Sequence, residues 1–180
     1  TGIPYRFYLH APAEHLTLIA LDNWQKEADA SAAWTLVKNP AHVVYRTDSS
    51  LDSVQYGIRH DKAYWVSNIR ARSAGYSDVD LNAPACGGTQ PVYTSSPIAG
   101  TQPVPWVGQQ RVQTQTQPLP AQMVLKGSLR NVLSATLDTA AVCLNGKPFQ
   151  YDITSDAPVS LTFSDGRTLS LVAGSNKGTL

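Results

Sequence analysis

Hydrophobic and polar side chains alternate with two different periods along this chain. Residues 5–10 alternate aromatic and polar side chains, which is typical of a strand, and Pro12 ends the pattern because proline cannot donate to a strand ladder. From Leu16 to Ala28 the apolar residues recur at nearly helical spacing, with charged side chains between them. This pattern predicts a helix with one buried stripe. The N-terminal part is therefore predicted to be a strand, a loop and a helix.

Beyond Asn39-Pro40 the period of the apolar side chains falls to about two, as it does in strands. The predicted strands are rich in β-branched and aromatic residues and comprise residues 42–46, 54–58 and 63–69, with weaker candidates at 79–81 and 92–94. Further on, Asn145-Gly146 separates residues 141–144 from 148–153, and Asp165-Gly166 separates 159–163 from 168–172. Both dipeptides are hairpin-turn sequences. Short strands at this spacing predict a β-sandwich.

The intervening segment 82–122 is rich in proline and contains the triplet Thr-Gln-Pro at 89–91, 101–103 and 116–118. Its unequal spacings exclude a repeat architecture. We expect extended edge strands and ordered loops here, with residues 113–117 as an exposed strand. The fold class is therefore predicted to be mainly β, an antiparallel β-sandwich preceded by a short strand–loop–helix element. The predicted domains are residues 1–34 and residues 35–180.

Composition excludes several functions. Charged residues make up 15% of the 180 residues, and the formal net charge is +1. The positively charged residues are scattered along the sequence, so no basic patch for nucleic acid is predicted. The longest apolar run is far short of the about 20 residues that a membrane span needs. The only glutamates are Glu14 and Glu27, and nothing indicates the carboxylate pair of a glycosidase. No cofactor is predicted.

Cys86 and Cys143 are the only cysteines. An even count, low charge and many Thr, Ser and Gln residues fit an exported protein, so we predict a secreted or periplasmic location. A disulfide between the two would close a long loop and stabilise the fold by about 4 kcal/mol on the chain-entropy model. The alternative is two buried free thiols.

His15 is the candidate catalytic residue, because it follows Glu14 on a loop between the predicted strand and helix. A histidine acts as a general base near neutral pH when a carboxylate fixes its tautomer. The chain contains no Gly-x-Ser-x-Gly nucleophile elbow. The serine and the acid would therefore lie elsewhere, or His15 is a structural loop residue. The separation of His10 and His15 fits no zinc motif, and no metal site is predicted.

Two further groups have a candidate role in binding. Tyr64, Trp65 and Trp106 could form an aromatic platform for a ligand such as a sugar, although aromatic residues in strands more often fill a core. The loop aspartates Asp48, Asp52 and Asp61 could bind calcium, but they lack the usual Asp-x-Asp-x-Asp-Gly loop and equally suit a solvated loop.

Two N-terminal segments resemble part of a known enzyme family. They are residues 3–9, Ile-Pro-Tyr-Arg-Phe-Tyr-Leu, and residues 13–17, Ala-Glu-His-Leu-Thr. Together they resemble the last sheet strand and the histidine loop of α/β-hydrolases of the esterase and prolyl-oligopeptidase kind. Segments 39–45, 60–67 and 155–161 resemble a β domain appended to some secreted members of that group.

The resemblance implies the C-terminal portion of a secreted serine hydrolase of the esterase or peptidase class. His15 would be its general base, and an upstream catalytic region or a companion chain would carry the serine and the acid. The β domain would shape substrate access. The alternative is a non-catalytic β-sandwich module that binds a carbohydrate or a protein.

Overall fold

The computed structural model describes residues 5–10, 25–32, 36–98 and 106–180. Its contacts divide the chain into two compact units. The first unit comprises Thr1–Leu36 and Thr89–Leu119, and the second comprises Val37–Gly88 and Pro120–Leu180. The first division follows residue 36, close to the predicted boundary at residue 34. The contacts also group residues 89–119 with the N-terminal segment. The sequence-based prediction places these residues in the domain of residues 35–180.

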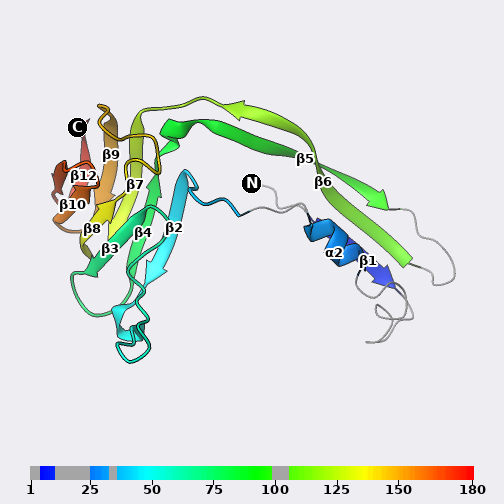
Figure 1. Ribbon diagram of the computed structural model, residues 1–180, viewed down its shortest axis with the longest axis horizontal. Coiled ribbons are helices and arrows are strands. Elements are labelled where there is room, and N and C mark those ends of the chain that lie inside the picture. Colours follow the sequence, from blue (N-terminus) through cyan, green and yellow to red (C-terminus); the bar gives the residue numbers. More distant parts are fainter. Residues whose placement is uncertain (1–4, 11–24, 33–35, 99–105) are drawn as a thin grey trace. The chain divides into compact units, whose positions relative to one another are not determined.

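The first unit contains a three-stranded sheet and one short helix (Figure 1). Its described elements are β1 (Tyr5–His10), α2 (Gln25–Ser31), β5 (Gly88–Ile98), whose first residue belongs to the second unit, and β6 (Trp106–Leu119). The strand order is β1-β6-β5, and β1 runs antiparallel to β6. Polar pairs link β5 to β6, as between the Thr94 and Thr114 hydroxyls at 3.0 Å.

The second unit is built from a four-stranded sheet, β11-β10-β8-β3, and a five-stranded sheet, β12-β9-β7-β4-β2. The strands of the smaller sheet are β3 (Val66–Ala71), β8 (Val132–Leu137), β10 (Val159–Phe163) and β11 (Thr168–Leu171). Those of the larger sheet are β2 (His42–Thr47), β4 (Ser77–Asn82), β7 (Val124–Arg130), β9 (Gln150–Ser155) and β12 (Gly174–Thr179). Two short 3-10 helices, η1 (Ser49–Leu51) and η2 (Pro84–Cys86), lie in the connections.

Both sheets contribute one apolar face to a common core. Buried and less buried side chains alternate along β4 and β10, as they do in strands with one face turned inward. The core cluster includes Leu81 and Ile153 from the larger sheet and Leu137 and Leu161 from the smaller one, each at most 1% exposed. The predicted mainly β, sandwich-like fold is confirmed. The sandwich is not purely antiparallel, because β7 with β9 and β8 with β10 are parallel pairs.

Several predicted elements agree with the structure. The strand at residues 5–10 is β1, and the exposed strand at 113–117 is part of β6. The predicted helix lies partly outside the described residues, and its observed part is α2. The hairpin at Asp165-Gly166 is confirmed as β10–β11. Its loop is one residue longer than the predicted turn, since the Phe163 N–H donates to Arg167 O and only Gly166 takes a positive φ, of 89°.

Two predicted strands are wrong. Residues 54–58 form a tight turn, with Gly57 at φ 64°. Residues 141–144 also form a turn rather than the first strand of a hairpin, because the Asp138 carboxylate accepts hydrogen bonds from the N–H groups of Ala140 and Ala141. The strand β9 that follows pairs with β7 and β12 instead. Local alternation could not reveal these long-range choices of partner.

Arg167 ties the β10–β11 loop to the end of the chain. Its guanidinium donates to the Asp165 carboxylate, with a shortest N–O distance of 2.6 Å, and to three backbone carbonyls. These carbonyls belong to Leu144 at 2.9 Å, Lys147 at 2.8 Å and Leu180 at 3.3 Å. The same group lies over the Phe149 ring, 4.8 Å from its centroid. One cation thus joins three segments of the second unit, the β10–β11 loop, the turn with Leu144 and Lys147, and Leu180.

We expect Arg167→Met to lower the free energy of unfolding by about 3 kcal/mol, because it leaves a largely buried carboxylate and three carbonyls without their donor. Urea denaturation measures this loss. The matched control is Lys177→Met, since Lys177 also pairs with a carboxylate, that of Asp152, but with 68% of its side chain exposed. The control variant should unfold close to the wild-type midpoint. Equal loss in both variants, or none in Arg167→Met, contradicts this role.

The same contact sets a pH dependence. The hydrogen bonds from Arg167 hold the pKa of the Asp165 carboxyl well below its ordinary value. A carboxyl whose pKa is lowered in the folded state stabilises the fold at any pH above its pKa in the unfolded chain, which is about 4. This contribution is lost as the pH falls below about 4 toward the lower pKa of the folded state. The stability of Arg167→Met should therefore fall less steeply than that of the wild type between about pH 5 and pH 2. Parallel acid profiles would contradict the assignment.

Candidate functional site

His15, the predicted general base, lies outside the described residues. The elements on its two sides are described, and they are the strand β1 before it and the helix α2 after it. A strand followed by a helix agrees with the predicted order, and the predicted loop between them, residues 11–24, lies outside the described residues. Among the described residues β1 is an edge strand, since β6 is its neighbour on one side and it has none on the other. His10 pairs in register with Trp106 of β6.

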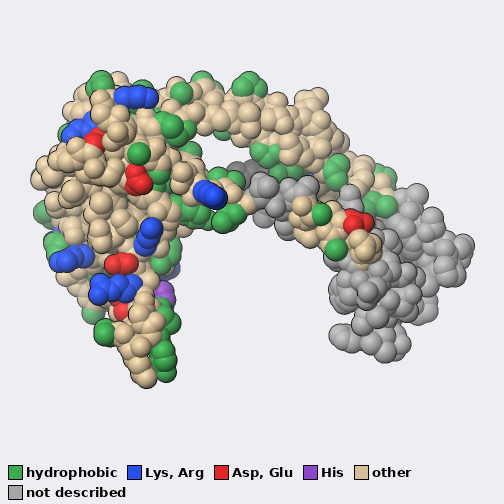
Figure 2. Space-filling view, viewed as in Figure 1, with side chains coloured by type: hydrophobic (Ala, Val, Ile, Leu, Met, Phe, Trp, Pro, Cys, Tyr) green, Lys and Arg blue, Asp and Glu red, His purple; other side chains and the backbone are tan. Residues whose placement is uncertain are grey.

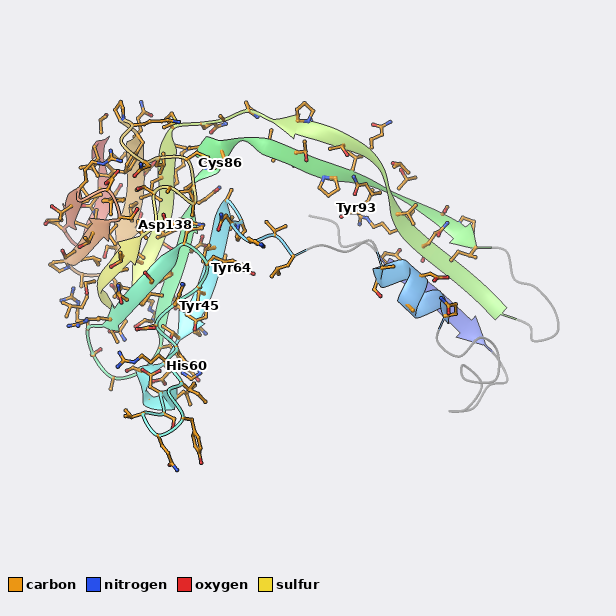
Figure 3. The ribbon with its side chains drawn as sticks, in the orientation of Figure 1. Tyr45, His60, Tyr64, Cys86, Tyr93 and Asp138 are labelled. Carbon is orange, nitrogen blue, oxygen red and sulfur yellow. A yellow bond between two sulfur atoms is a disulfide. The ribbon has the colours of Figure 1, made fainter. Side chains whose placement is uncertain are left out.

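The structure does not assemble Tyr64, Trp65 and Trp106 into a described platform. Trp65 is only 2% exposed and its indole N–H donates to the carbonyl of Pro40 at 2.7 Å, so it is a core residue. Tyr64 is 51% exposed, with a positive φ of 53° (Figure 3). Trp106 is the first residue of β6 in the first unit, and the structure describes its backbone but not its side chain. Of the three aromatic side chains, Tyr64 is thus the one shown at the surface.

The carboxylates of Asp48 and Asp52 bind groups of the chain itself, and Asp61 accepts through its backbone carbonyl from the Ile69 N–H. Asp48 accepts from the Ser50 N–H at 2.9 Å, and this hydrogen bond lowers the pKa of its carboxyl. Asp52 accepts from the backbone N–H of His60 at 2.8 Å and lies 3.0 Å from its Nδ1, contacts that lower the pKa of the Asp52 carboxyl. Within the described ranges no three His, Cys, Asp or Glu side chains form a metal-binding group. Asp48 and Asp52 therefore order this loop.

The disulfide is confirmed. Cys86, at the end of η2, is bonded to Cys143, in the turn before β9, with their Cα atoms 5.0 Å apart. The bridge closes a loop with a sequence separation of 57 residues. Cys86 is exposed, and Cys143 is partly buried with a φ of 61°. Figure 3 labels Cys86 close to the start of β5. The bridge holds a turn that has no regular strand partner.

An open groove of about 450 Å³ lies where β7 and β9 begin and β12 ends. Gln150 marks the meeting point, because it pairs in register with Val124 of β7 and with Thr179 of β12. The polar lining residues are Gln122, Lys126, Gln150 and Thr179, and the apolar ones are Met123, Val124, Pro148 and Phe149. Within the described part of the chain, the side chains of Gln122, Lys126 and Gln150 make no hydrogen bond. They are free to contact a polar ligand.

Sequence reasoning missed this groove because it depends on the parallel pairing of β7 with β9, which brings Gln122 next to Gln150. A polar residue just before an apolar strand is too common to single out. The only available signal was the glutamine at or before the start of both strands.

No family model, curated protein or solved structure matches the chain. No described helix has the length and apolar character needed to cross a membrane.

Proposed function

We propose that this chain is the C-terminal portion of a secreted or periplasmic serine hydrolase of the esterase or peptidase class. The observation that carries the proposal is that the strand β1 precedes Glu14-His15 in the sequence and the helix α2 follows it, as the predicted strand–loop–helix order requires. In α/β-hydrolases the general base sits on such a loop at the end of a sheet strand. The free edge of β1 in the described sheet leaves room for a strand of an upstream catalytic sheet.

The chemistry would be acyl transfer to a serine. His15 would take the proton from the serine hydroxyl as its oxygen attacks the carbonyl carbon, and would return it to the leaving alcohol or amine. The serine and the acid that orients His15 would come from an upstream region or a companion chain. The second unit would do no chemistry and would shape access of the substrate. The disulfide fits the oxidising compartment that this role requires.

A fluorophosphonate probe tests the proposal, because it bonds covalently to a serine that a neighbouring base activates. In the full-length protein, peptide mass mapping should locate the label on one serine outside residues 37–180. Prior inhibition by phenylmethanesulfonyl fluoride should prevent labelling. A label within residues 37–180, or no label on folded protein, would contradict the proposal.

The second candidate function is a carbohydrate-binding module, and the groove at the start of β7 and β9 favours it. Amide, hydroxyl and ammonium groups on an open surface are suited to sugar hydroxyls. This function predicts retention on an insoluble polysaccharide, weakened several-fold by Gln150→Ala. Lys177→Ala, on the exposed strand β12 but outside the groove lining, is the control. Equal retention of the wild type and both variants would exclude the groove as the ligand site.

A further inference from the structure

The loop between β2 and β3 carries a group of exposed apolar side chains, which we call the apolar tip. It consists of Leu51, Val54, Tyr56 and Ile58, which are 64%, 95%, 72% and 48% exposed. Leu51 ends the η1 helix, and the tip projects at the end of the second unit beyond β2 (Figure 1), with hydrophobic side chains on its surface (Figure 2). It therefore offers a partner a protrusion.

Hydrogen bonds order the tip. Ser53 and Ile58 exchange two backbone hydrogen bonds of 3.0 Å each, and the Gly57 N–H donates to Val54 O at 3.2 Å. At its base, the carbonyl of His60 (Figure 3) accepts from the hydroxyls of Tyr45 and Thr47. The apolar side chains are therefore presented to solvent by an ordered turn and are not the by-product of a loose loop. A preformed tip loses little conformational entropy when it binds.

The apex of the tip carries no charge. Residues 53–58 contain none, and the single charged residue between positions 49 and 58 is Asp52. Asp52 is bound to His60, which turns this carboxylate toward the base of the loop. Beside the tip, Arg59 and Lys62 are balanced by Asp48 and Asp61. Entry of the apex into an apolar medium would thus bury no charge, and attraction to a charged surface would add little.

The size of the tip argues against a protein partner. Four side chains on one turn offer at most a few hundred Å² of apolar surface. A stable protein interface needs about 800 Å² from each partner. Binding to a lipid surface needs no such area. A few apolar side chains suffice, because their transfer from water to the boundary between headgroups and acyl chains is favourable. Tyrosine is also favoured at that depth, where its ring is apolar and its hydroxyl remains hydrated.

We propose that the apolar tip inserts into the surface of a neutral phospholipid bilayer and anchors the second unit there. The anchoring is reversible, since only four side chains enter, and it depends on apolar contact. It does not rest on the proposed hydrolase function and goes beyond it, because it places the protein at a lipid–water interface whatever reaction the chain serves.

Sedimentation of the full chain with sucrose-loaded phosphatidylcholine vesicles tests the proposal. The wild-type chain should pellet with the vesicles, and Val54→Ser/Tyr56→Ser should lower the partition coefficient at least about tenfold. The matched control is Leu133→Ser/Val172→Ser, which removes two similarly exposed apolar side chains, 46% and 64% exposed, from other parts of the second unit. The control should pellet like the wild type. Binding should persist in about 0.5 M salt, where charge attraction is screened.

Four results would overturn the proposal. They are failure of the wild type to pellet, equal binding by Val54→Ser/Tyr56→Ser, equal loss in the control variant, or binding that needs anionic lipid and disappears in salt. A dimer that the tip substitutions dissociate, without vesicle binding, would assign the tip to self-association instead. Should the double variant lose its thermal transition, Val54→Ser alone decides the matter, because that side chain is almost fully exposed.

Discussion

Replacing His15 by alanine is expected to lower kcat/KM for ester hydrolysis by the full-length protein at least about 10³-fold. Without the imidazole, the serine hydroxyl has no base to take its proton, and the leaving group has no acid. The residual rate would come from binding and from stabilisation of the oxyanion. The measurement is hydrolysis of p-nitrophenyl acetate by the purified variant, with circular dichroism to show that the fold is unchanged.

The matched control is His42→Ala. His42 also has a carboxylate partner, since its Nε2 lies 2.7 Å from Asp80 Oδ1, but it is half exposed on β2 of the sandwich. It has no part in the proposed chemistry, so its loss should leave kcat/KM unchanged. Wild-type activity in His15→Ala would end the assignment of His15, and a similar loss in His42→Ala would show that the effect is not specific to the base.

Removing the disulfide with Cys86→Ser/Cys143→Ser is expected to lower the free energy of unfolding by about 4 kcal/mol. The bridge closes a loop with a separation of 57 residues, so its loss frees many conformations of the unfolded chain. It also releases the turn at residues 138–146, in which Cys143 has a positive φ. For the second unit, which contains both cysteines, the thermal midpoint should fall by about 15 °C.

Reduction of the wild type supplies an independent comparison. Dithiothreitol should lower the thermal midpoint of the wild type toward that of the double variant and should leave the midpoint of the variant itself unchanged. Because Cys86 is exposed, reduction should not require prior unfolding. A variant as stable as the oxidised wild type would show that the bridge contributes no stability.

The mainly β fold could be predicted because its signals are local. The alternation of apolar residues in 159–163 and 168–171 follows directly from a strand pair with one buried face, and Asp165-Gly166 marks the turn between them. The parallel pairs could not be predicted, since β7 and β9 are joined only by long-range contacts. Tyr64 and Trp65 illustrate the same limit, because neighbouring aromatic residues gave no indication that one is buried and the other exposed.

Among the candidate sites, too, some could be predicted from the sequence and others could not. Two cysteines and a composition typical of exported proteins favoured a disulfide over two free thiols, and the structure contains the disulfide. The role of Arg167 could not be predicted, because the acceptors of its hydrogen bonds belong to residues 144, 147, 165 and 180, which meet only in the folded chain. The part of the apolar tip at residues 54–58 is a strand in the sequence-based prediction, because an ordered turn with exposed valine, tyrosine and isoleucine has the same composition as a buried strand.

The most direct test of the central claim is the release of p-nitrophenol in the first turnover of the full-length protein. A serine hydrolase whose acyl-enzyme forms faster than it hydrolyses releases a rapid burst before the steady rate. We expect a burst close to the molar amount of protein, abolished by His15→Ala and retained by His42→Ala. A burst and a steady rate that both survive in His15→Ala, or no hydrolysis above the buffer rate by the folded wild-type protein, would contradict the account.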